Sequence, residues 1–71
     1  MSVPKNKKFN PNRITALREL HALNQSAFAR RLRKGIQRQH VNNWELGISR
    51  PSIASLENIA NTFKVNMDYF F

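Results

Sequence analysis

The sequence predicts a compact all-α domain, and three features indicate it. Apolar residues recur three or four positions apart along most of the chain, which is the spacing of one helix face. No segment alternates apolar and polar residues for long enough to indicate a strand. The chain has 71 residues and no cysteine, so a single domain without disulfides must be stabilised by packed helices or by oligomerisation.

The first nine residues lie before any helix signal. They contain three lysines and no apolar period, so we predict a basic flexible arm over residues 1–9 and a folded domain over residues 10–71. The arm either follows a nucleic-acid backbone or serves as a solubilising tail.

Start signals mark the first two helices. Asn10 can accept a hydrogen bond from a free N–H, and Pro11 gives up a donor that the first turn does not need. Isoleucine and leucine at helical spacing extend this helix over residues 11–22. Asn24 caps the next helix, which begins at residue 25 and which its apolar stripe extends to residue 32 or 33.

The third helix follows a turn at Gly35, which supplies the left-handed backbone that a sharp turn needs. Apolar residues on both sides of a cap at Gln37 form a hydrophobic staple, which places the helix over residues 38–46. Gly47 ends it as a C-terminal glycine. We expect its inner side to hold Val41, Trp44 and the stem of Leu46.

Ser52 is a good N-cap, and the clearest amphipathic stripe of the chain follows it, predicting a helix over residues 53–63. Asn66 then caps a last short turn. Three aromatic residues end the chain, more than one short turn can bury: Tyr69, Phe70 and Phe71. Either they fold back onto the first and fourth helices, or they form part of a dimer face.

Positive charge is concentrated in the first half of the chain. Residues 1–40 hold ten basic residues and one acidic residue, whereas residues 41–71 hold two basic and three acidic residues. This asymmetry indicates a polyanionic partner, with nucleic acid favoured over an anionic membrane; the alternative is a solvated basic face that binds nothing. The sequence has no membrane-spanning apolar run and no secretory signal, so we expect a cytoplasmic protein.

The outer side of the helix over residues 38–46 has the chemistry that base reading requires. Arginine can pair with the two acceptors of guanine, and asparagine or glutamine can pair with adenine. The residues that share this face, and that we predict to read bases, are Arg38, Gln39, Asn42 and Asn43. The alternative is an ordinary solvated surface. His40 lies beside them and either contacts phosphate or a base, or is a bystander.

The sequence lacks the signs of an enzyme. Two histidines, four acids and no cysteine cannot easily form a closed zinc site. Neither a nucleophile elbow nor a glycine-rich phosphate loop is present. We therefore expect no catalytic site, metal, cofactor or small-molecule ligand.

A family pattern extends over about residues 13–70. The residues that carry it are Arg18, Leu23, Asn24, Gln25, Phe28, Ala29, Leu32, Gly35, Val41, Trp44, Glu45, Leu46, Gly47, Pro51, Ser52 and residues 65–70. With them the chain resembles the phage repressor and Cro-like helix-turn-helix family, above all over residues 25–46. The resemblance implies a compact five-helix lambda repressor-like domain. Its second helix would lie across the DNA backbone while the third enters the major groove.

The resemblance also implies roles for individual residues. Positions that face bases in the family are matched by Arg38, Gln39 and Asn43, with Asn42 beside them. Phosphate-binding positions are matched by Asn24 and Gln25 at the start of the second helix. Arg50, in the loop after the third helix, is placed to contact phosphate. A salt bridge between the first and third helices is matched by Arg18 and Glu45; the alternative is two independent surface charges.

One departure from the family lies before the third helix. Eleven residues separate Ala29 from Val41, two more than the family usually has, so Arg33 and Lys34 are interpreted as an insertion. Either the second helix is longer by about half a turn, or the turn itself is longer. The sign and place of the two charges predict further phosphate contacts near the groove edge.

Together these features predict a sequence-specific, non-enzymatic DNA-binding protein that regulates transcription, of the repressor or Cro-like type found in phages and bacteria. We expect a homodimer on a palindromic operator, because the family commonly dimerises through the region from the fourth to the fifth helix. The first alternative is an antitoxin-type autorepressor that also binds a toxin protein. The second is a protein-interaction module with the same fold, and the third is a basic membrane-surface protein.

Overall fold

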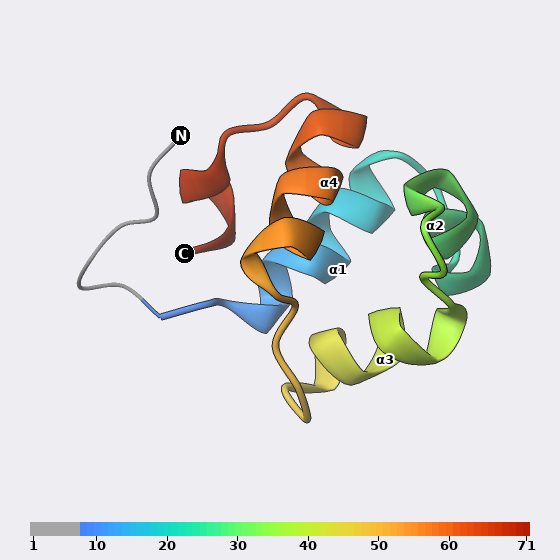
Figure 1. Ribbon diagram of the computed structural model, residues 1–71, viewed down its shortest axis with the longest axis horizontal. Coiled ribbons are helices and arrows are strands. Elements are labelled where there is room, and N and C mark those ends of the chain that lie inside the picture. The colour runs from blue at the N-terminus through green and yellow to red at the C-terminus, as the bar shows by residue number, and fades with distance from the viewer. Residues whose placement is uncertain (1–7) are drawn as a thin grey trace.

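Four α-helices and a final 3-10 helix pack around one core in the computed structural model, which describes residues 8–71 (Figure 1). The elements are α1 Pro11–Leu20, α2 Gln25–Leu32, α3 Arg38–Leu46, α4 Ile53–Phe63 and the 3-10 helix η1 Met67–Phe70. No strand occurs within residues 8–71, which agrees with the all-α prediction. In this part of the chain, no helix has the length and apolarity that crossing a membrane requires.

The expectation of five α-helices is wrong, because η1 is only a 3-10 turn. Its hydrogen bonds reach three residues back: Phe71 N–H donates to the Asp68 carbonyl at 3.2 Å. The two buried residues of η1 are Met67 and Phe70, also three apart. A 3-10 helix has three residues per turn, so it places both side chains on the core side.

Side-chain caps begin three of the α-helices, as the sequence predicts. The side-chain oxygen lies 3.0 Å from the backbone nitrogen that it caps at Asn10, 2.8 Å at Asn24 and 3.1 Å at Ser52. α1 ends at Leu20, two residues before the predicted end, since the backbone turns left-handed at Ala22 with a φ of 55°.

The core is apolar and is formed by all five elements. Its buried residues are Ile14, Leu17, Phe28, Ala29, Leu32, Val41, Trp44, Leu56, Ile59, Ala60, Phe63, Met67 and Phe70. The rings of Phe28 and Phe63 stack with their centroids 4.8 Å apart, which fixes α2 on α4. α3 contributes only Val41 and Trp44, so it is held to the core by one narrow side and leaves the rest of its surface outside.

Phe9 and Asn10 contact the rest of the fold, although the predicted arm includes Phe9. Phe9 is partly buried and packs against the core. Asn10 N–H donates to the Phe70 carbonyl at 2.8 Å, so the start of α1 is tied to the end of η1. Of the arm predicted over residues 1–9, residues 1–7 lie outside the described part of the chain.

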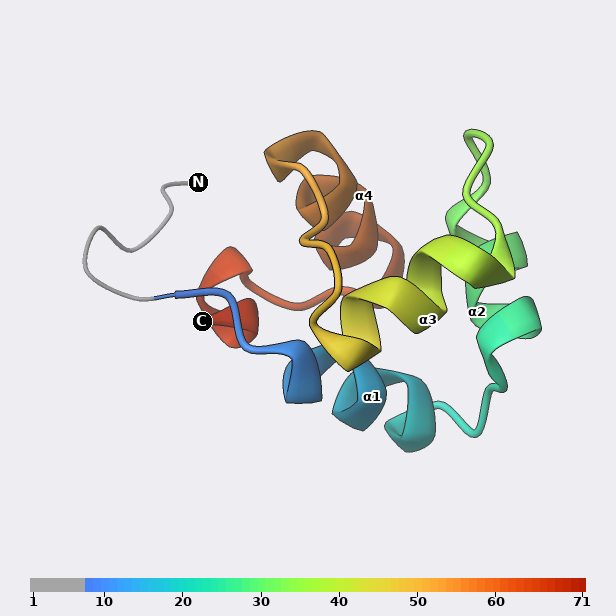
Figure 2. The same cartoon turned by 90° about the horizontal axis from the view of Figure 1, so that it is seen from below.

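The two additional residues lengthen the turn rather than α2. The helix ends at Leu32, whose carbonyl accepts from Asn58 Nδ2 on α4 at 2.9 Å. Arg33, Lys34 and Gly35 then follow with φ values of 59°, 54° and 78°. Three successive positive φ angles, two of them at residues with a side chain, are costly by about 1–3 kcal/mol per strained residue. Figure 2 shows the resulting turn projecting from the body between α2 and α3.

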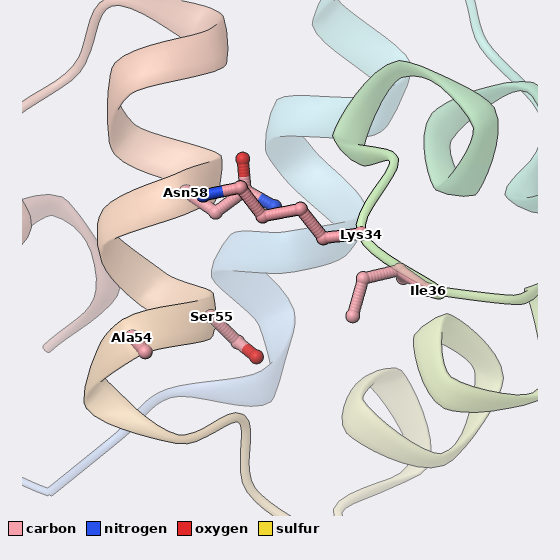
Figure 3. A pocket seen from close by; sticks show the side chains of 5 residues that line it. All are labelled: Lys34, Ile36, Ala54, Ser55 and Asn58. Carbon is pink, nitrogen blue, oxygen red and sulfur yellow. The ribbon is translucent and has the colours of Figure 1, made fainter.

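The turn and α4 enclose an open hollow of about 220 Å³ (Figure 3). It is lined by Lys34, Ile36, Ala54, Ser55 and Asn58. The Lys34 side chain extends from the turn toward Asn58, across this hollow. Lys34 therefore lies on the α4 side of the turn.

Candidate nucleic-acid interface

The outer face of α3 is the candidate DNA-reading surface. The buried residues of α3 are Val41 and Trp44, and the residues on the opposite side of the helix are exposed or partly buried. Arg38 and Gln39 are exposed, and Asn42 and Asn43 are partly buried. The structure thus places all four residues predicted to read bases outside the core on a single helix.

Two of these side chains are joined to each other. Gln39 Nε2 donates to Asn43 Oδ1 at 3.0 Å, across one turn of the helix. The Gln39 oxygen and the Asn43 amino group remain as an acceptor and a donor. That is the combination that the major-groove edge of adenine complements.

Leu46 belongs to this face. The sequence interpretation placed its stem on the inner side of the helix, and that placement is wrong. Its side chain is 65% exposed. Leu46 follows Gln39 by seven residues and Asn43 by three, so the three side chains form one stripe. The outward position of Leu46 could therefore have been predicted from the helical period alone. An exposed leucine beside amide groups can make apolar contact with a thymine methyl group.

An ion pair fixes α3 against α1. Arg18 Nε donates to Glu45 Oε2 at 2.8 Å, and Arg18 Nη2 donates to Glu45 Oε1 at 3.1 Å. Arg18 Nη1 also donates to the Leu23 carbonyl at 3.0 Å, which ties the loop before α2 to the same group. The side chains of the pair are only 17% and 8% exposed, so water screens them little. The geometry is the two-pronged one in which arginine holds a carboxylate most firmly.

The pair changes the pKa of both groups. Burial acts to raise the pKa of Glu45, but hydrogen bonds from Arg18 and Gln25 and the charge of Arg18 outweigh it and lower that pKa below its ordinary value. The hydrogen bond to Glu45 raises the pKa of Arg18. Both groups are therefore charged at neutral pH.

Gln25 has a structural role that the sequence interpretation missed. Its Nε2 donates to Glu45 Oε1 at 3.1 Å and to Asn42 Oδ1 at 3.3 Å. The first residue of α2 is thereby bonded to two α3 residues that lie about one helical turn apart. No local sequence signal links these residues, because they lie 17 and 20 positions apart.

His40 acts as a cap of α3. Its Nδ1 accepts from the Gln37 backbone N–H at 3.0 Å. The side chain is exposed, and its ring centroid lies 6.4 Å from that of Trp44. Trp44 itself is only 4% exposed, so it is a core residue and does not offer its ring to a base.

A basic hollow of about 240 Å³ lies on α2 and the turn that follows. It is lined by Ala27, Arg30, Arg31 and Arg33. The three arginines are exposed, and within residues 8–71 the one ion pair is that of Arg18 with Glu45. Three guanidinium groups without a carboxylate partner form a surface that attracts phosphate. The sequence interpretation selected Arg33 but not Arg30 and Arg31, although both lie on the side of α2 away from the buried residues.

The remaining residues predicted to bind phosphate are Asn24, Lys34 and Arg50. Asn24 uses its side-chain oxygen to cap α2. Lys34 extends toward α4 rather than toward the outer face of α3 (Figure 3). Arg50 is exposed in the loop between α3 and α4.

The three C-terminal aromatic residues have different surroundings. Phe70 is fully buried, so its side chain is not available for the dimer contact that was one of its two interpretations. Tyr69 is partly buried, and the Arg13 guanidinium lies 5.2 Å from its ring centroid. Phe71 is also partly buried. Of these three residues, Tyr69 and Phe71 retain exposed surface.

Two helices joined by a turn, with the second anchored by a narrow side and presenting polar side chains outward, define a helix-turn-helix DNA-binding domain. The family comparison agrees: the model of the Cro/C1-type helix-turn-helix family matches residues 14–70. The chain therefore belongs to the helix-turn-helix family, a family of DNA-binding transcription regulators. Comparison with curated proteins and with solved structures finds no match.

Proposed function

We propose that this protein is a sequence-specific, repressor or Cro-like regulator that reads an operator in the major groove with α3. The observation that carries the proposal is the outer face of α3, where arginine and three amide side chains face away from the core. The ion pair of Arg18 with Glu45 holds this helix in one pose. A reading helix must keep one pose, because base-edge hydrogen bonds tolerate little misplacement.

Phosphate contacts surround the reading helix in this proposal. The candidate residues are Asn24, Gln25, Arg33, Lys34, His40 and Arg50, with Arg30 and Arg31 added by the basic hollow. Gln25 would contribute through its backbone N–H at the start of α2, since its side chain is bonded to α3. Lys34 would reach DNA by turning from α4, which its exposure permits.

The protein would bind a palindromic operator as a homodimer. Tyr69 and Phe71 supply partly exposed aromatic surface at one end of the domain. Two copies related by a two-fold axis would place their α3 helices in successive major grooves, about one helical turn of DNA apart.

The test is selection of bound sequences from a random pool of duplexes. We expect an enriched palindrome whose half-sites are centred about 10 base pairs apart, or a multiple of that spacing. A selected set without a common motif would contradict sequence-specific reading. No gel retardation of any duplex at low salt would contradict DNA binding itself and favour a protein-interaction module.

An antitoxin-type autorepressor is the second candidate, and exposed apolar side chains favour it. Leu20 is 75% exposed and Ile48 is 69% exposed. Neither is a candidate for phosphate binding, so DNA binding does not explain their exposure. A contiguous exposed apolar patch marks a site for a protein partner, and this candidate requires Leu20 and Ile48 to contribute to one. Co-purification of a second protein with the tagged chain, and its loss on Leu20→Ser or Ile48→Ser, would support this candidate.

A further inference from the structure

A chain of hydrogen bonds crosses the three helices that meet behind the reading face. It begins at Arg18 on α1, continues through Glu45 on α3 and Gln25 on α2, and ends at Asn42 on α3. The successive donor–acceptor distances are 2.8 Å from Arg18 to Glu45, 3.1 Å from Gln25 to Glu45 and 3.3 Å from Gln25 to Asn42. Every member is partly buried.

The charges at one end determine the direction of every bond in this chain. A guanidinium can only donate, and a carboxylate can only accept. Gln25 must therefore turn its amino group, not its oxygen, toward Glu45, because two acceptors would repel each other. The same amino group also donates to Asn42, which must therefore turn its side-chain oxygen toward Gln25. Neither amide can be reversed without placing like groups against each other.

We propose that this arrangement makes Asn42 a hydrogen-bond donor toward DNA, and that Asn42 thereby selects guanine. The proposal rests on the proposed function. With Oδ1 held by Gln25, the amino group of Asn42 is the part of the amide directed away from α2. The major-groove edge of guanine carries two adjacent acceptors, O6 and N7, and no donor. Adenine carries an amino group beside N7, and thymine carries a single acceptor, O4, beside its methyl group. An asparagine amide that can rotate offers both a donor and an acceptor, and it therefore suits adenine. The Asn42 amide is held with only its donor toward DNA, and it therefore suits guanine.

Gln25 is a positioning residue in this proposal and Asn42 is the specificity-determining residue. The remaining amide pair, Gln39 with Asn43, keeps both an acceptor and a donor. The two parts of the α3 face therefore differ in the base that they select. The operator should contain a position where a G·C pair is required by Asn42, separate from any position read by Gln39 and Asn43.

The experiment compares operators selected by four proteins from the same random duplex pool: wild type, Asn42→Ala, Gln25→Met and Asn61→Leu. Asn42→Ala identifies the base pair that Asn42 reads, because the base preference of the wild type should disappear at that one operator position and at no other. We expect this pair to be G·C, preferred over A·T by about tenfold in affinity. In Gln25→Met the preference at this same pair should shrink to about twofold, because the Asn42 amide can then turn. Asn61, exposed on α4, is the control and should change no position.

A second measurement covers the case in which Gln25→Met fails to fold. In the wild-type operator, that guanine is replaced in one half-site by 7-deazaguanine, which lacks N7, or by 6-thioguanine, whose acceptor at position 6 is weakened. At least one replacement should lower wild-type affinity by about tenfold. Asn42→Asp retains an acceptor for Gln25 but cannot donate, so it should be insensitive to both replacements.

The outcomes separate the two proposals. A wild-type selection without a motif overturns the proposed function and this inference with it. A motif in which the Asn42-dependent pair is A·T, or in which Asn42→Ala changes no position, leaves the function intact and overturns the inference. Insensitivity of the wild type to both guanine replacements, or an unchanged G·C preference in a folded Gln25→Met protein, also overturns it.

Discussion

Arg18 Nε and Glu45 Oε2 lie 2.8 Å apart although the two residues are separated by 27 positions in the sequence. The contact joins the end of α1 to the last turn of α3. α3 has only two side chains in the core, so this pair is a third point of attachment. A helix fixed at three points cannot rotate about its axis, and its outward residues keep one orientation.

Removing either partner of this pair should destabilise the protein by about 2 kcal/mol, because the other charge is left partly buried without a partner. The melting temperature of Arg18→Met and of Glu45→Leu should each fall by about 10 °C. The double variant should lose less than the sum of the single losses, since the two charges are coupled. Glu57→Gln, an exposed acid on α4, is the control. Additive losses would show that the two residues act independently.

Stability should fall in acid through Glu45. The pKa of this group is lower in the folded protein than its ordinary value of 4.5, so the unfolded chain binds the proton more readily. Its contribution is therefore fully present above pH 4.5 and is lost as the pH falls through the lowered pKa. Urea unfolding at several pH values should give a steeper acid loss for the wild type than for Glu45→Gln. Parallel pH profiles for the two proteins would contradict this assignment.

Glycine in place of Arg33 should relieve backbone strain in the turn after α2 and stabilise the protein. Arg33 has a φ of 59° and a ψ of −153°, a region that suits glycine alone, so Arg33→Gly should stabilise the protein by about 1 kcal/mol. Gly35→Ala should cost about 1 kcal/mol through its φ of 78° alone, because a methyl group there would meet nothing within 4 Å. Arg31→Gly, inside α2, is the matched control and should destabilise by about 1 kcal/mol. Urea denaturation measures all three, and a loss of stability in Arg33→Gly would contradict the strain.

Neutralising the basic hollow should weaken the salt dependence of DNA binding. Replacement of Arg30, Arg31 and Arg33 by glutamine should reduce the slope of log K against log salt by roughly one for each phosphate that the variant no longer neutralises. Deleting residues 33–34 should reduce the slope by up to about two. Lys64→Gln, beyond the end of α4, should leave the slope unchanged. An unchanged slope in the triple variant would remove these arginines from the interface.

The aromatic end should separate into a core residue and surface residues. Phe70→Ala should destabilise the protein by about 3–5 kcal/mol, because its ring is fully buried. The double variant Tyr69→Ala and Phe71→Ala should lose less stability but bind a palindromic duplex with lower cooperativity. Thermal unfolding measures the first effect, and titration of one-site and two-site duplexes measures the second. Equal cooperativity in the double variant and the wild type would exclude these two side chains from a dimer contact.

Much of the local structure was predictable because its causes are local. A cap such as Ser52 bonds to a backbone N–H three residues away, and the apolar stripe after it recurs within one turn. The bounds of α3 and α4 were therefore predicted to the residue. At η1 the same reasoning predicted the short turn, whereas the family resemblance wrongly implied a fifth α-helix. The expected side-chain cap at Asn66 does not form.

The candidate site was predictable in its residue types but not in its connections. The outward position of Gln39 and Asn43 follows from helical periodicity, as does that of Leu46, which the sequence interpretation placed wrongly. The exposure of Tyr69 and the burial of Phe70 do not follow from their order in the chain. Whether each of these adjacent aromatic residues is buried depends on which side of it the rest of the fold lies.

The sequence by itself determined the helices, their caps, the basic first half and the polar outer face of α3, since each depends on neighbours within about one turn or on composition. The tertiary structure alone decided which side chains meet across helices. It brought Gln25 to Glu45 and Asn42, and it put the two additional residues into the turn rather than into α2. The physical reason is that hydrogen bonds between helices depend on packing of the whole core, which fixes distances that no local pattern contains.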